Sequence, residues 1–332
     1  MNEAVFQSCL KAEIGMYYDF CKESFSPNTC AIYAGHLKSF DRYLCQVGYS
    51  GGYISSEIID GWLSALSGFR NFTIAGYLTT LRGLLKYLAR HGVGSYFPPT
   101  RKKIYDYIPY IFSEAEMERI FDVADNYEVR WNNKIPYIQL EFPMVLRILC
   151  GCGTRLVETL NIQMKDVDLE KSVLTMRTTK WNKERFVPMT AQLGDMLNRY
   201  CLAMGLVGMP EAYLFPRKSF SEPLTHYDMR NRFNLLLRLA GITLEGRAFQ
   251  ERGPCMHCFR HGFVFRSFKK LEYEGIRIDD AVPILSIYLG HFDLTETEKY
   301  MKFSSQLFPE ELEKYEQYTE GLFPELNMEE LV

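Results

Sequence analysis

The sequence predicts a mainly α-helical fold with one small β-hairpin (an α+β fold), divided into two domains. Apolar residues recur at helical spacing through most of the 332 residues. One stretch is rich in β-forming residues around a polar turn, and a run of glycine, proline and basic residues separates an upstream from a downstream segment. A chain of this length is long enough for about two domains.

The upstream segment, residues 1–95, is expected to form a unit of four or so helices. One run of apolar residues at helical spacing ends at Phe40 and Leu44, and a second covers 74–88. Ser55 and Glu57 precede a third, short helix around Trp62. Residues 96–111 contain three prolines and a basic triplet, which predicts an extended linker.

The second domain is expected over residues 112–308. Ser113 and Glu116 form the pattern of a capping box at the start of its first helix. Residues 172–178 and 185–188 read as the two strands of a hairpin whose turn carries two lysines. Further helices are predicted over 225–240, 258–274, 284–290 and 296–303.

The charge distribution is compatible with a nucleic-acid partner, although the net charge is −3. Residues 309–332 contain eight glutamates and one lysine, a net charge of −7, and the rest of the chain carries +4. Basic residues cluster in the linker and in the hairpin, where phosphate binding is expected. The candidate DNA-binding residues are Arg101, Lys102, Lys103, Lys183 and Arg185.

Six residues in the downstream segment have, as an ordered set, the chemistry of phosphoryl transfer. Guanidinium groups hold phosphate oxygens bidentately. Lysine and imidazole groups transfer protons, and a tyrosine hydroxyl can attack phosphorus to form an ester. The set indicates a DNA strand transferase, and it consists of Arg155, Lys180, His257, Arg260, His291 and Tyr300.

Four strings that contain these residues resemble the signature boxes of the tyrosine recombinases, also called the phage integrase family. They are GCGTRLVETL (151–160), TTKWNKERFVPM (178–189), MHCFRHGF (256–263) and YLGHFDLTETEKYMKF (288–303), and their order and spacing match as well. The upstream helical unit looks like the core-binding domain of that family. The resemblance therefore implies a DNA-clamping domain followed by a catalytic domain.

The resemblance also implies a role for each matching residue. Arg155 and Arg260 would clamp the scissile phosphate while Tyr300 attacks it. Lys180, rather than the nearby Lys183, would protonate the leaving 5′-oxygen.

Three histidines and one acid complete the implied site. His257 would assist proton removal or bind the phosphate, and His291 would hold another phosphate oxygen. Glu158 would accompany the first arginine, and His261 is expected just outside the reacting groups. The implied reaction forms a 3′-phosphotyrosine ester and needs neither a metal ion, nor a cofactor, nor ATP.

The cysteines leave one alternative open. Nine scattered cysteines without a secretory signal predict buried thiols. Cys255 and Cys258 flank His257, and their spacing supplies half of a zinc site. No second pair of zinc ligands lies nearby in the sequence. A metal bound to His257 would also occupy a residue that the strand transferase needs.

The implied partner is double-stranded DNA, bound by a dimer at each site and a tetramer in the synapse. We expect a cytoplasmic protein without membrane spans. The acidic tail, residues 309–332, would dock on a neighbouring protomer or fold back on its own domain.

Two alternatives to a recombinase are a type IB topoisomerase-like enzyme and a non-catalytic DNA-binding accessory protein. The DNA site and the biological task, whether integration, excision, inversion or dimer resolution, stay open.

Overall fold

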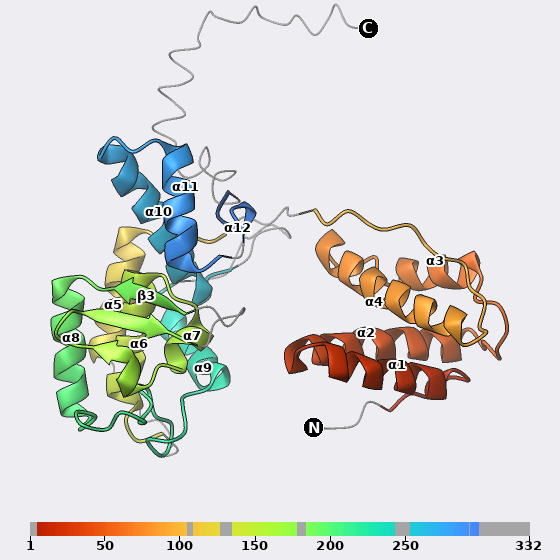
Figure 1. Ribbon diagram of the computed structural model, residues 1–332, viewed down its shortest axis with the longest axis horizontal. Helices are drawn as coiled ribbons and strands as arrows, with labels where there is room; N and C mark the ends of the chain where they lie inside the picture. Colours follow the sequence, from red (N-terminus) through yellow and green to blue (C-terminus); the bar gives the residue numbers. More distant parts are fainter. Residues whose placement is uncertain are drawn as a thin grey trace, which may run out of the picture. The chain divides into compact units, whose positions relative to one another are not determined.

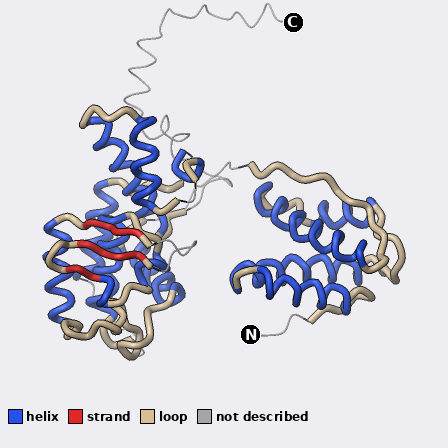
Figure 2. The backbone as a smooth tube through the Cα atoms, in the orientation of Figure 1, coloured by secondary structure: helices blue, strands red, loops and turns tan. Residues whose placement is uncertain are grey.

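The computed structural model describes residues 5–104, 109–126, 135–177, 184–242, 253–291 and 293–298. The chain divides into two compact units, Met1–Asp106 and Tyr107–Val332 (Figure 1). The boundary between the units falls inside the linker that the sequence predicts at 96–111. Among the described residues all three strands belong to the second unit, as Figure 2 shows.

The described part of the first unit is a four-helix unit, which confirms the expected all-helical upstream segment. Its helices are α1 (Lys11–Ser24), α2 (Pro27–Gln46), α3 (Ser56–Ala65) and α4 (Asn71–Arg90). Ser26 caps α2 by accepting a hydrogen bond from the backbone of Thr29, as its position before Pro27 favours. Trp62 is fully buried against Phe40, with ring centroids 5.1 Å apart.

The segment that follows α4 is extended and lies along that helix. Arg82 and Lys86 lie over the ring of Phe97, and the guanidinium of Arg82 also donates to the carbonyl of Pro98. Further on, Lys103 lies 5.3 Å above the ring of Phe72. The first part of the predicted linker therefore belongs to the first unit.

The second unit combines helices with a three-stranded antiparallel sheet. The sheet has the order β1-β2-β3 and consists of β1 (Val167–Asp168), β2 (Val173–Met176) and β3 (Arg185–Pro188). The helices are α5 (Glu114–Asn126), α6 (Ile138–Cys152), α7 (Leu156–Leu160), η1 (Met164–Asp166), α8 (Ala191–Ala203), α9 (His226–Leu239), α10 (His257–Tyr273), α11 (Ile278–Leu289) and α12 (Thr295–Glu298).

The hairpin confirms the strands predicted at 172–178 and 185–188. Leu174 pairs with Val187, and both side chains are buried in a core shared with α6 and α8. The alternate face is exposed at Phe186, as expected for a sheet covered on one side. The sequence missed β1, because a two-residue strand leaves no periodic pattern. The predicted turn, with its two lysines, lies outside the described residues.

The start of α5 also confirms the sequence prediction. Ser113 and Glu116 form the predicted capping box before α5: each side chain accepts a hydrogen bond from the backbone of the other residue. The start predicted for α11 was wrong, because α11 begins at Ile278 rather than at residue 284 and contains Pro283. Burial of Ala281 and Val282 in the cluster with α10 accounts for a helix that continues through a proline.

All nine cysteines are thiols, but the prediction that they are buried holds for only five of them. Cys9, Cys45 and Cys255 are exposed and Cys150 is half-buried. Within the described residues, no helix is both long and apolar enough to span a membrane.

Candidate active site

Arg155 lies between α6 and α7, just after a turn in which position 153 must be glycine. Gly153 ends α6 with φ +60°, and a Cβ atom built there would lie 2.3 Å from the ring of Phe263. Two residues later, Arg155 is the N-cap of α7. The Arg155 side chain is 26% exposed.

Glu158 holds Arg155 from within the first turn of α7. Its Oε1 accepts from Nη1 of Arg155 at 2.8 Å, and its Oε2 accepts from the Arg155 backbone N–H at 3.1 Å. The Glu158 side chain is 4% exposed. Burial alone would raise its pKa, but hydrogen bonds and charge from Arg185 and Arg155 outweigh burial and hold the pKa below its usual value.

Arg185, the first residue of β3, connects this acid to α11. Its Nη2 and Nη1 donate to the Glu158 carboxylate at 2.7 and 3.3 Å, and its Nε donates to the carbonyl of Tyr288 at 3.0 Å. Its side chain is 10% exposed. The guanidinium also lies against Gly290, where an added Cβ would meet it at 2.9 Å. Arg185 was predicted to bind DNA, and the structure directs these donors into the protein.

Arg260, in the first turn of α10, is 1% exposed and is held by backbone carbonyls from two other segments. Its Nη1 donates to Gly153 at 2.7 Å, and its Nη2 donates to Leu289 at 3.0 Å. The same Nη2 lies 2.9 Å from Nε2 of His291. Arg260 thereby connects the ends of α6 and α11 with the imidazole.

His291 follows Gly290, whose φ of +64° ends α11. Its Nδ1 lies 2.6 Å from Oγ1 of Thr297. Burial, then the charges of Arg260, Arg155 and Arg185, lower its pKa to about 3, so the imidazole is neutral near pH 7. Because Arg260 can only donate, Nε2 is the acceptor and Nδ1–H donates to Thr297. Glu296, 3.9 Å from Nε2, therefore forms no ion pair with His291 at this pH.

Glu296 and Thr297 are residues that the sequence did not single out. Oε2 of Glu296 lies 3.8 Å from Nη2 of Arg155, and Thr297 is fully buried beside His291. Both belong to α12, which starts four residues after the histidine. A glutamate and a threonine shortly after a histidine form no recognisable sequence pattern. Their contacts with the site exist only in the folded protein, where α12 lies over it.

His257 and His261 lie one turn apart on α10. Their rings are 4.6 Å apart at an interplanar angle of 86°, with His257 exposed and His261 buried. His257 is the first residue of the helix that carries Arg260. His261, which the sequence predicts just outside the reacting groups, therefore contacts the ring of His257.

The structure thus brings five of the predicted site residues into one cluster: hydrogen bonds join Glu158 to Arg155 and Arg185, and Arg260 to His291. Glu296 lies between these two groups, 3.8 Å from Arg155 and 3.9 Å from His291. Lys180, Lys183 and Tyr300 lie outside the described residues. The triplet 101–103 is exposed in the first unit.

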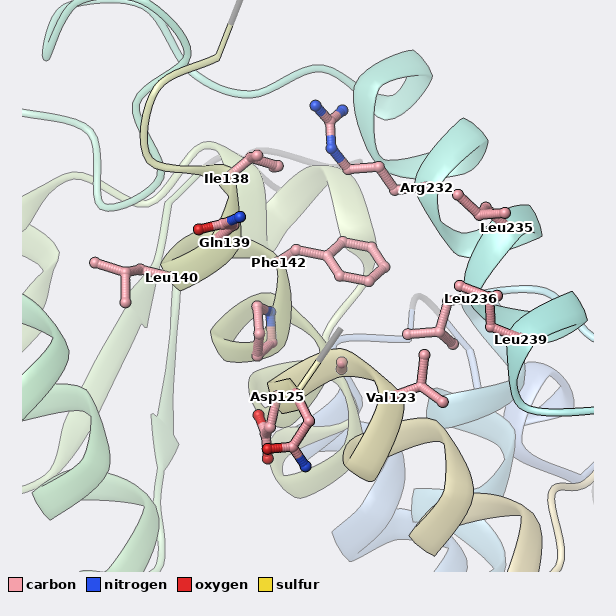
Figure 3. A pocket seen from close by; sticks show the side chains of 13 residues that line it. Val123, Asp125, Ile138, Gln139, Leu140, Phe142, Arg232, Leu235, Leu236 and Leu239 are labelled. Carbon is pink, nitrogen blue, oxygen red and sulfur yellow. The ribbon is translucent and has the colours of Figure 1, made fainter. Parts of the chain in front are cut away.

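A pocket in the second unit lies elsewhere. Side chains of α5, α6 and α9 line it, with Phe142, Leu236 and Leu239 on its apolar walls and Asp125 and Arg232 among its polar residues (Figure 3). None of the cluster residues lines this pocket. In the part of the chain that the structure describes, no three His, Cys, Asp or Glu side chains are placed to hold a metal ion.

The fold of this chain is similar to those of solved recombinase and integrase structures. The chain matches the XerH site-specific recombinase in a pre-cleavage complex with its difH substrate, with a TM-score of 0.67 and 19% identity over 87% of this chain and 91% of that one. It also matches a lambda integrase dimer bound to a core site, with a TM-score of 0.63 and 14% identity over 88% of this chain and 76% of that one.

Sequence comparison adds relatives of the same kind. The chain is 30% identical to the putative integrase/recombinase y4rB of Sinorhizobium fredii, over 61% of this chain and 64% of the relative. It is 26% identical to the tyrosine recombinase XerD of Pseudomonas putida, over 84% of this chain and 88% of the relative. The model of the phage integrase family matches residues 111–306, which include the whole arginine and histidine cluster. The chain therefore belongs to the phage integrase family.

Proposed function

We propose that this protein is a site-specific DNA recombinase or integrase that cleaves and rejoins strands through a 3′-phosphotyrosine ester. The observation that carries the proposal is the cluster of Arg155, Arg260 and His291, which come from separate segments and meet in one place. Membership of the phage integrase family supports the same reaction.

The charge of the cluster supports an anionic substrate. The guanidiniums of Arg260, Arg155 and Arg185 all act on His291, and after burial their charges are what lowers its pKa. A phosphodiester carries one negative charge, so its binding beside these guanidiniums offsets their effect and raises the pKa of the imidazole, which can then donate from Nε2 to a phosphate oxygen.

The reaction exchanges one phosphoester bond for another. The oxygen of Tyr300 bonds to phosphorus as the bond from phosphorus to the 5′-oxygen breaks. His257 accepts or relays the phenolic proton, and Lys180 gives a proton to the leaving oxygen. Arg155 and Arg260 stabilise the extra negative charge of the pentacoordinate transition state. Because ester energy is kept in the phosphotyrosine, the 5′-hydroxyl of a partner strand can reverse the step.

The proposed partner is double-stranded DNA, bound by a dimer at each site and by a tetramer when two sites recombine. The XerH and lambda integrase structures that the chain resembles both contain DNA, and the latter is a dimer. The basic triplet Arg101-Lys102-Lys103 and the hairpin lysine Lys183 would contact backbone phosphates.

Tyr300→Phe tests the proposal directly. The target site is first selected by binding from a random duplex library, and a nicked version then traps the cleaved strand. The wild-type protein should form a denaturant-resistant adduct with DNA. The Phe variant should bind the site within about twofold, because the phosphate contacts remain, but should form no adduct.

Tyr288→Phe is the matched control, since Tyr288 is the tyrosine that precedes Tyr300 in the sequence and should keep full activity. An adduct that persists in Tyr300→Phe and disappears in Tyr288→Phe would overturn the assignment of the nucleophile. An adduct without strand exchange between two duplexes would indicate a topoisomerase-like enzyme instead.

A further inference from the structure

Two thiols lie within reach of each other at the start of α10. The Sγ atoms of Cys255 and Cys258 are 3.6 Å apart, and the backbone N–H of Cys258 donates to the carbonyl of Cys255 at 2.9 Å. Such a turn places the two Cα atoms about 5 Å apart, inside the range that a disulfide spans. A rotation of the side chains that brings the sulfurs together therefore suffices to form the bond.

The two thiols differ in access to solvent. Cys255 is exposed, whereas Cys258 is 2% exposed and belongs to the core cluster of the second unit. An external reagent therefore reaches Cys255 first, and Cys258 is placed to react with a group attached to Cys255.

We propose that Cys255 and Cys258 form a thiol–disulfide exchange site for low-molecular-weight disulfides of the glutathione type. The thiolate of Cys255 attacks one sulfur of oxidised glutathione, which forms a mixed disulfide and releases one glutathione. The thiolate of Cys258 then attacks the Cys255 sulfur, forms the internal disulfide and releases the second glutathione. Two protein thiols are oxidised, one disulfide is reduced, and the two thiol protons pass to the released glutathiones.

The other closely spaced cysteines lack this arrangement. Cys150 and Cys152 lie two residues apart at the end of α6, where Cys152 is 1% exposed. The Sγ of Cys150 accepts a hydrogen bond from Arg266 at 3.4 Å. This pair therefore has neither the one-turn spacing nor an exposed attacking thiol.

The disulfide would close a ring around Met256 and His257. The effect on strand cleavage rests on the function proposed above, in which His257 handles the proton of the nucleophile. Catalytic hydrogen bonds commonly tighten only when substrate binds, so we expect His257 to shift with the first turn of α10 as the phosphate is bound. The ring restricts this turn, and oxidation should therefore slow cleavage while DNA binding persists.

The first measurement concerns the chemistry alone. The full-length protein is incubated with millimolar oxidised glutathione, remaining thiols are alkylated, and peptides are mapped by mass spectrometry. The expected product is a Cys255–Cys258 disulfide that dithiothreitol reverses. Cys255→Ser should show no disulfide at Cys258, and Cys150→Ser should behave as the wild type. A folded protein that remains fully reduced at these two positions, or that pairs other cysteines instead, overturns the proposal.

The second measurement concerns the consequence. Covalent DNA adduct formation should fall by roughly 10² in the oxidised protein, as for loss of a proton-transferring group, and should return on reduction. Cys255→Ser should keep its activity in oxidised glutathione. Unchanged cleavage by a protein shown to carry the disulfide would overturn the regulatory role. Absence of cleavage in the reduced wild type would overturn the proposed function, while the mapping still decides the exchange site.

Discussion

Arg185 donates hydrogen bonds from both terminal nitrogens to the carboxylate of Glu158. Glu158 in turn accepts from the side chain and the backbone of Arg155. One buried acid thus couples strand β3 to the arginine that opens α7. Since Arg185 also donates to the carbonyl of Tyr288, it fixes the end of α11 from which His291 extends.

Replacing Arg185 should therefore destabilise the second unit. Arg185→Met leaves Glu158 buried with one of its two partners removed, which should lower the free energy of unfolding by about 3 kcal/mol. Urea unfolding measures the change. Arg199→Met is the control: Arg199 pairs with Asp195 at 2.7 Å, and 78% and 55% of the two side chains are exposed. Its loss should cost much less, because an exposed ion pair contributes little to stability. Equal stability of the two variants, with weaker DNA binding by Arg185→Met, would favour the DNA-binding role predicted from sequence.

Gly290→Ala should also disturb the position of the Arg185 side chain. The new Cβ would lie 2.9 Å from Nη1 of Arg185, at a φ of +64°. Gly205→Ala is the matched control, because Gly205 has φ +66° and nothing within 4 Å of an added Cβ. Both variants share the backbone strain of about 1 kcal/mol, and Gly290→Ala should lose roughly 1–3 kcal/mol more from overpacking. Equal thermal midpoints would show that Arg185 moves aside without loss.

The low pKa of His291 makes stability depend on pH. Its pKa is about 3 in the folded protein, below the usual value near 6.5, so the unfolded chain binds the extra proton between these values. Stability should therefore be lost as the pH falls through this window. When the pH falls from 7 to 5, the titration of His291 should lower the free energy of unfolding by about 2 kcal/mol.

The pH dependence can be measured by urea unfolding at both pH values. His291→Asn should lose less stability than the wild type on acidification, by about that amount. The exposed His226, replaced by Asn, serves as the control and should leave the wild-type dependence unchanged. Parallel behaviour of the two variants would contradict a neutral, buried His291.

The two hairpin lysines compete for one role in protonating the leaving group. Lys180→Ala should slow cleavage by roughly 10²–10⁴, as loss of a general acid does. A 5′-thiolate leaving group needs no proton and should restore much of this rate. Lys183→Ala is the matched control and should show little rescue. Rescue of Lys183→Ala but not of Lys180→Ala would reverse the assignment.

The acidic tail should affect assembly rather than binding at a single site. Residues 309–332 carry a net charge of −7 but also contain Leu322, Phe323, Leu326 and Leu331, too apolar for a purely solvating tail. Docking on a neighbouring protomer would bury these side chains and keep the glutamates away from DNA. Truncation after Phe308 should therefore keep or strengthen binding to one site and weaken the multi-protomer complex. Sedimentation on DNA compares the two proteins, and equal assembly would rule out docking in trans.

The sequence by itself determined the helical character, the hairpin and the order of the reacting groups. These features depend on local chemistry. The apolar period of α4, the Ser113 cap of α5 and the β-forming residues around Leu174 act within one element. Residue type and spacing likewise single out Arg155, Arg260 and His291, because a reaction at phosphate demands those groups wherever the chain places them.

Only the tertiary structure decided how these groups are held. Arg185 looks like any basic residue near a turn, and its contact with Glu158 exists because β3 folds beside α7 and α11. Thr297 and Glu296 reach the site because α12 returns over His291. The low pKa of His291 follows from burial beside three guanidiniums drawn from different elements. Such contacts join residues far apart in sequence, and no local pattern encodes the distance between them.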